Sequence, residues 1–182
     1  MRSPSLEENP LPDKDADEAP DSELSRSPHH RHLSRLIGNW EGISRTWFEP
    51  GKLADESPVT GTIRPVFDGR FVAHEYESSL QGKRLVGMAI HGYAIQRKMF
   101  VTAWVDGFHM GTDIMLSEGG SEFEGDGFSV LGGYGDPKIG ARWGWRTEVE
   151  LQGEDAMTIT HYNIDPAGEE AKAVEIQYKR KA

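Results

Sequence analysis

From residue 39 onward the chain consists of short apolar or alternating segments, separated by turn residues at intervals of roughly ten residues. This rhythm is typical of an all-β sandwich or barrel, because each segment has the length of a strand. Turn-forming sequences such as Phe67-Asp68-Gly69 and Asp165-Pro166-Ala167-Gly168 lie between the segments. We therefore predict a single antiparallel up-and-down β-barrel of about 8–10 strands. The predicted strands are 39–48, 58–67, 70–79, 84–94, 98–105, 111–117, 121–125, 128–132, 141–151, 156–164 and 171–180.

Alternation within these strands predicts an inner and an outer face, because successive side chains point to opposite sides of a sheet. In 141–151, Trp143 and Trp145 share the apolar face, opposite the charged Arg142 and Arg146. The segment 98–105 is apolar on both faces, which predicts a covered outer surface or a subunit contact. The same alternation assigns to the barrel interior His74, Tyr76, His161, Tyr178 and Arg180.

The first 32 residues have a different composition from the rest of the chain. They hold eight acidic and four basic residues and no Phe, Trp or Tyr. Such a segment cannot bury enough apolar surface to offset its ordering entropy, so we expect a disordered acidic tail over 1–32. The barrel domain then spans 33–182 and opens with a short helical turn at 33–37. The tail ends in His29, His30 and His32, which we interpret as incidental rather than as a metal site.

Composition excludes several classes of function. The chain contains no cysteine, which rules out disulfides, thiolate catalysis and cysteine-ligated metals and fits a cytoplasmic location. A net charge of −10 argues against binding to nucleic acid, whose affinity for proteins depends on a basic surface. No apolar run reaches the roughly 18 residues of a transmembrane helix, so we expect no membrane partner. No serine lies in a Gly-x-Ser-x-Gly motif, and nothing in the sequence supports catalysis.

The segment Gly38-x-Trp40-x-Gly42 resembles the opening Gly-x-Trp of lipocalins and their calycin relatives. In that superfamily the tryptophan lies across the closed end of the barrel, and an arginine from the last strand stacks on it. Arg180 is the matching position here, and the resemblance therefore implies a cation–π contact of about 0.5–2 kcal/mol that joins the first strand to the last.

A wider pattern is similar to an uncharacterised bacterial family of lipocalin-like barrels. It comprises Gly69-Arg70-Phe71, His91-Gly92-Tyr93, Thr102-Ala103-Trp104-Val105-Asp106, Ser117-Glu118-Gly119 and Tyr178-Lys179-Arg180. The similarity extends over 33–182 and implies a fold, but no reaction, ligand or cofactor.

Our leading hypothesis is a non-enzymatic barrel that holds a small, largely apolar molecule. One alternative is a haem- or metal-binding barrel of nitrobindin type, with His74 or His161 as ligand. Another is a filled structural barrel that forms a homodimer through 98–105. His91 and His109 lie near turns and are expected at the surface. The predicted ligand-binding residues are His74, Tyr76, Trp104, Trp143, Trp145, His161 and Tyr178, with Trp40 and Arg180 closing the barrel.

Overall fold

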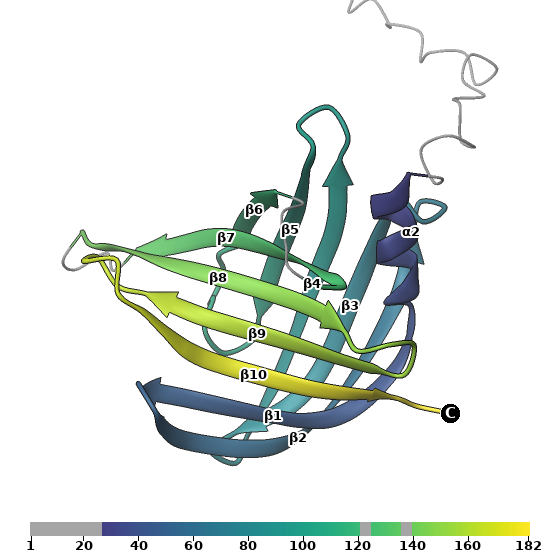
Figure 1. Ribbon diagram of the computed structural model, residues 1–182. Coiled ribbons are helices and arrows are strands. Elements are labelled where there is room, and N and C mark those ends of the chain that lie inside the picture. The colour runs from purple at the N-terminus through teal and green to yellow at the C-terminus, as the bar shows by residue number, and fades with distance from the viewer. Residues whose placement is uncertain (1–26, 121–124, 136–139) are drawn as a thin grey trace, which may run out of the picture.

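The computed structural model describes residues 27–120, 125–135 and 140–182. Within these ranges the chain forms one short helix followed by ten strands, shown in Figure 1. The elements are α2 (Pro28–Arg35), β1 (Gly38–Glu49), β2 (Lys52–Val66), β3 (Phe71–Leu80), β4 (Lys83–Ala94), β5 (Met99–Asp106), β6 (Met115–Gly120), β7 (Gly127–Gly135), β8 (Arg142–Leu151), β9 (Ala156–Ile164) and β10 (Glu170–Arg180).

The strands close into one antiparallel up-and-down barrel, which confirms the predicted fold class. Each strand pairs with its neighbours in sequence, and the order around the barrel is β1-β10-β9-β8-β7-β6-β5-β4-β3-β2. The first and last strands complete the ring, from the pair Trp40↔Arg180 to the pair Thr46↔Val174. Tight hairpins make this topology accessible: Gln81 and Gly82 both adopt positive φ (49° and 74°) in the two-residue turn that joins β3 to β4.

The strands begin and end close to where the sequence predicted, with two differences. Strand β2 starts at Lys52 rather than at 58, so β1 and β2 form a longer hairpin than expected. The first four residues of the predicted strand 111–117 form a turn and an irregular segment, and β6 begins only at Met115. Most of the predicted strand 121–125 lies outside the described residues.

Helix α2 is longer than the expected turn at 33–37 and begins at Pro28. Two local signals explain its start. Ser27 is the N-cap and its Oγ accepts a hydrogen bond from the backbone N–H of His30 (3.2 Å), and proline suits the first helical position because it has no N–H to leave unpaired. The helix therefore contains the three histidines that the sequence assigned to the tail, His29, His30 and His32.

The apolar core lies at the barrel end beneath α2. Leu33 and Leu36 of the helix region are buried against Trp40 and a stacked pair of rings, Phe100 and Phe128, whose centroids are 4.5 Å apart. The indole N–H of Trp40 donates to the backbone oxygen of Leu36 (2.9 Å), so this buried polar group is satisfied. The helix and core together close this end of the barrel.

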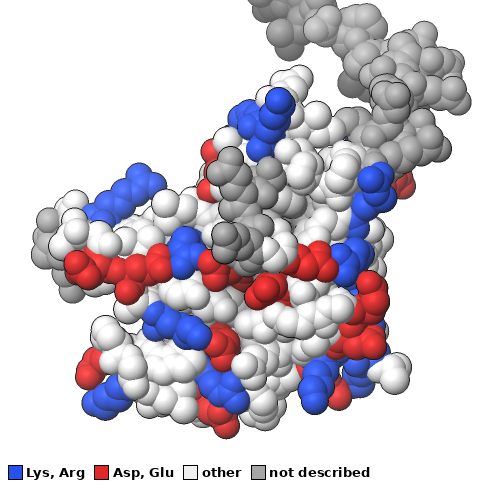
Figure 2. Space-filling view, in the orientation of Figure 1, with Lys and Arg blue, Asp and Glu red and all other residues white. Residues whose placement is uncertain are grey.

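Charged side chains lie on the outer face of the barrel, where β8 and β10 carry interspersed acids and bases (Figure 2). Arg146 on β8, for example, contacts Glu148 on its own strand and Glu170 on β10. This outer polarity follows from the alternation that turns Trp145 and Thr147 inward on the same strand.

Candidate functional site at the open end of the barrel

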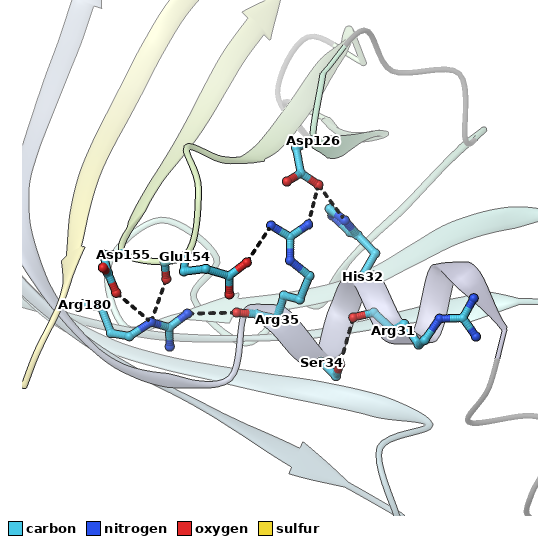
Figure 3. Close-up of polar contacts among 8 residues, drawn as sticks. All are labelled: Arg31, His32, Ser34, Arg35, Asp126, Glu154, Asp155 and Arg180. Atoms are coloured by element: carbon cyan, nitrogen blue, oxygen red, sulfur yellow. Dashed lines mark hydrogen bonds and ion pairs between the residues drawn. The ribbon is translucent and has the colours of Figure 1, made fainter.

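Arg180 holds the closed end of the barrel together. Its guanidinium carbon lies 4.2 Å from the centroid of the Trp40 ring. The same guanidinium donates hydrogen bonds to the backbone oxygens of Ile37 (2.6 Å), Arg35 (2.9 Å) and Glu154 (2.8 Å). One side chain thus joins the first strand, the last strand, the helix end and the β8–β9 turn. Figure 3 shows its contacts with Arg35 at the helix end and with Glu154 in the turn.

A second layer of contacts fastens helix α2 to this end. Arg35 reaches two acids from neighbouring turns, Asp126 at 2.7 Å and Glu154 at 3.3 Å, and His32 Nδ1 lies 3.3 Å from the same oxygen of Asp126 (Figure 3). With helix and ion pairs across it, this end offers no entrance. A ligand site must therefore be sought at the opposite end, where β1 ends and β2 begins.

Two histidines inside the barrel, the buried His91 on β4 and the partly buried His161 on β9, each contact a threonine on the strand next to their own. His91 Nδ1 lies 2.9 Å from Thr102 Oγ1, and His161 Nδ1 lies 2.9 Å from Thr147 Oγ1. The surface position predicted for His91 is wrong, since the residue is only 4% exposed. Its neighbours at 89 and 93 show why: the alternation along β4 turns this histidine inward, although it lies close to the strand end.

A third buried histidine, His74, completes a cluster of titratable groups. Its Nε2 lies 3.2 Å from the hydroxyl of Tyr178. Burial lowers the pKa of His91 and His161 to about 4, with the charges of neighbouring histidines adding to the effect at His161. Burial, reinforced by His91 and His161, lowers the pKa of His74 to about 3. All three rings are therefore neutral near pH 7.

Aromatic rings line the barrel interior beside these histidines. The indole N–H of Trp104 donates to the hydroxyl of Tyr76 (2.8 Å). Trp104 stacks parallel to Trp145 with centroids 5.9 Å apart, and His161 stacks on Trp145 at 5.3 Å. Two voids among these side chains have volumes of about 30 Å³ each, which is room for about one water molecule. The deep interior is thus nearly filled by its own side chains.

The open end of the barrel holds a larger pocket of about 390 Å³. Trp104 and Trp145 form its floor and therefore separate it from the deep voids. At its rim the hydroxyl of Tyr134 donates to Asn163 Oδ1 (2.6 Å). The lining residues are Thr46, Trp47, Phe48, Trp104, His109, Met110, Asp113, Met115, Tyr134, Gly135, Trp145, Asn163, Ala173 and Val174.

The seven predicted ligand-binding residues lie in three different places. Five of them surround the deep voids, whereas Tyr178 packs in the closed core beside Trp40. Trp143 stacks on Tyr134 and does not line the pocket. The five residues around the voids are His74, Tyr76, Trp104, Trp145 and His161.

Sequence reasoning missed a hydrogen-bonded pair of side chains at the pocket wall. The Asp106 side chain is fully buried, and its Oδ2 lies 2.5 Å from Nδ1 of His109. Its Oδ1 accepts from the backbone N–H groups of His109 (2.7 Å) and Met110 (2.8 Å). Burial alone would raise the pKa of Asp106, but these hydrogen bonds outweigh burial and lower it. The sequence signal that could have revealed this pair is the spacing Asp-x-x-His directly after a predicted strand. One turn is enough to bring two side chains at this spacing together.

Two negative findings apply to the part of the chain that the structure describes. No group of three or more His, Asp or Glu side chains is arranged to hold a metal ion. Among the described helices, α2 included, none combines the length and apolar character needed to span a bilayer.

Residues 25–180 match the family described as protein of unknown function DUF1579. The chain belongs to this family. No curated protein matches the sequence. Two solved structures resemble this DUF1579 protein at 11% identity each: Rv2717c from M. tuberculosis (TM-score 0.60, covering 86% of this chain and 99% of the other) and the S-type phycobiliprotein lyase CPES from Guillardia theta (TM-score 0.54, covering 89% and 97%). At this identity the likeness is one of fold alone.

Proposed function

We propose that this DUF1579 protein binds a small, largely apolar molecule at the open end of its barrel. The observation that carries the proposal is the pocket of about 390 Å³, which has the size of a small-molecule site. Its walls combine indole and aliphatic surface with a few polar groups, as sites that bind and orient small molecules generally do. The barrel would act as a binding protein, with no reaction assigned to it.

The proposed site lies nearer the open end of the barrel than we expected from the sequence. The two voids among the buried histidines are too small for an organic ligand, at about 30 Å³ each. The ligand would therefore rest on Trp104 and Trp145 rather than reach His74. In this arrangement the buried histidines support the floor of the site and do not touch the ligand.

We also propose that the barrel belongs to the lipocalin-like calycin group. Support comes from the closed end, where Arg180 covers Trp40 at 4.2 Å as the resemblance implied. The phycobiliprotein lyase has a similar fold, which is compatible with small-molecule binding by a barrel of this type. A similar fold does not identify the ligand of this protein, however.

The test is a fluorescence titration of the full chain with fatty acids, retinoids and flavins. We expect saturable quenching by at least one probe class, because Trp104 and Trp145 would contact the ligand. Trp145→Ala should weaken binding about tenfold or more, since it removes one aromatic wall. Trp143→Ala is the matched control: it is two residues away on β8 and outside the pocket, so affinity should stay within about twofold. No saturable change with any probe would contradict the proposal.

Haem binding at His74 or His161 does not fit the residues as arranged. Each ring already uses one nitrogen for a hydrogen bond, and the voids beside them hold about 30 Å³. A macrocycle would have to displace the stacked Trp104 and Trp145. A haem titration checks this conclusion: we expect no Soret band, and a band lost in His161→Ala would reinstate haem as the ligand.

A homodimer is the second candidate, and we propose that it forms through the outer face around β5. Support comes from exposed apolar side chains on the neighbouring strands: Ile90 is 36% exposed, Leu116 70% and Leu131 51%. Ile90, Ala103 and Leu116 are cross-strand partners, so they form one continuous apolar row. Light scattering should give a dimer mass that Leu116→Glu reduces to a monomer mass; a monomer at high concentration in the unmodified chain would refute this candidate.

A further inference from the structure

The pair Asp106–His109 lies where β5 ends and the following turn begins, at the wall of the open-end pocket, which we call the mouth pocket. Asp106 is the last residue of β5, and its carboxylate is completely removed from solvent. His109 follows three residues later, is 39% exposed and lines the pocket. A buried carboxylate is costly unless it is well hydrogen-bonded. Because Asp106 needs its hydrogen bond to the ring of His109, it holds the imidazole in one orientation.

The contacts of Asp106 determine which nitrogen of His109 carries the proton. The pKa of Asp106 is lowered, and an ionised carboxylate can only accept hydrogen bonds. His109 Nδ1, at 2.5 Å from Oδ2, must therefore be the donor. In the neutral ring the other nitrogen, Nε2, is then a hydrogen-bond acceptor. Among the described residues nothing hydrogen-bonds this Nε2, so it is available to a molecule in the pocket.

We propose that His109 is the polar anchor of the mouth pocket and selects a ligand that carries a hydroxyl group on an aromatic or otherwise planar apolar body. The proposal rests on the proposed function, because it names the class of ligand for the same pocket. The hydroxyl would donate to His109 Nε2, and the planar body would lie against the indole of Trp104, whose ring centroid is 6.4 Å from that of His109. Catalysis is not required for this role.

Charge in the pocket favours a neutral hydroxyl over an anionic group. The carboxylate of Asp106 lies directly behind His109, and Asp113 lines the same pocket. Both carboxylates would repel a bound carboxylate or phosphate in this partly enclosed site. A neutral donor has no such cost and still satisfies the acceptor nitrogen of His109.

The experiment compares two probes that differ in one group, 2-naphthol and 2-methylnaphthalene, by tryptophan fluorescence titration of the full chain. We expect 2-naphthol to bind about five- to tenfold more tightly, the effect of one net hydrogen bond. Asp106→Asn should reduce this preference, because the hydroxyl could then only accept a hydrogen bond from His109, and a phenol oxygen is a weak acceptor. The backbone N–H groups would hold the amide oxygen of the asparagine, so its NH₂ would donate to His109 Nδ1 and move the ring proton to Nε2.

Three further measurements complete the design. His109→Phe keeps an aromatic ring but removes every hydrogen-bonding atom, so it should abolish the preference and tests the anchor even if Asp106→Asn fails to fold. Asp155→Asn removes one exposed carboxylate at the closed end and should preserve the preference, which controls for net charge. Long-range ¹⁵N–¹H NMR should find the proton of His109 on Nδ1 in the unmodified chain and on Nε2 in Asp106→Asn.

The outcomes separate this inference from the proposed function. Equal affinity for the two probes, or a hydroxyl preference that survives in His109→Phe, overturns the anchor role and leaves the binding pocket standing. Tighter binding of 2-naphthoate than of 2-naphthol also overturns it. Binding of none of these naphthalenes overturns the pocket and the anchor together.

Discussion

Acidification should destabilise this barrel through its buried histidines, and His91 offers the clearest test. In the folded chain burial lowers the pKa of His91 to about 4, whereas a histidine in an unfolded chain titrates near 6.5. The unfolded state therefore binds a proton between these pH values and the folded state does not. The stability that His91 contributes is complete above pH ~6.5 and is lost as the pH falls towards ~4.

The size of the effect follows from this difference in pKa. Between pH 7 and pH 5 the unfolded chain becomes almost fully protonated at this site while the folded chain stays about nine-tenths neutral, which costs about 1.8 kcal/mol. The value changes little if the folded pKa is a unit lower, because pH 5 already lies above it. His74 and His161 have similarly lowered pKa values, so the three together would remove about 5 kcal/mol, a large share of a typical folding free energy.

The assay is urea unfolding followed by tryptophan fluorescence at pH 7, 6 and 5. We compare the unmodified chain with His91→Asn, which keeps a polar group next to Thr102 but does not titrate in this range. The variant should lose about 1.8 kcal/mol less stability between pH 7 and pH 5, whatever its stability at pH 7. His29→Asn is the comparison variant: burial also lowers the pKa of this partly buried ring on α2, so it should change the pH dependence in the same direction but by less than His91→Asn. An unchanged pH dependence in His91→Asn would refute the reasoning and indicate that the ring is hydrated in the folded barrel.

Two predictions concern packing. Arg180→Lys should destabilise the fold by about 2 kcal/mol in urea unfolding at pH 7, since an ammonium cannot both cover the Trp40 ring and reach three backbone oxygens. A loss below about 0.5 kcal/mol would show that the closed end does not depend on the guanidinium. Gly61→Ala should cost about 1–3 kcal/mol, because the new methyl group would lie 2.7 Å from Tyr178 Oη. Its control, Gly107→Ala, has no neighbour closer than 3.4 Å and should be nearly neutral; equal losses in the two variants would argue against a clash.

Some features of this protein were determined by its sequence alone. The period-2 pattern in strands such as β8 specifies both the strand and the side that faces inward, because it depends only on local backbone geometry. The spacing of the turns specifies hairpins between neighbours, and those hairpins lead to a meander that must close or leave its edges exposed. Trp40 and Arg180 were paired from sequence through the resemblance to known barrels, at opposite ends of the domain.

Other features were decided only by the tertiary structure, because they depend on volume and on distances between strands. Alternation turned Trp143 and Trp145 to the same side, but only the closed barrel distinguishes Trp143, which stacks on Tyr134 outside the pocket, from Trp145 on the pocket floor. Likewise, alternation predicted that His74 and His161 point inward, but it could not predict how much space lies beside them. That space is about 30 Å³ in each void. A sequence records the direction of each side chain, whereas the room left for a ligand depends on how all the strands pack together.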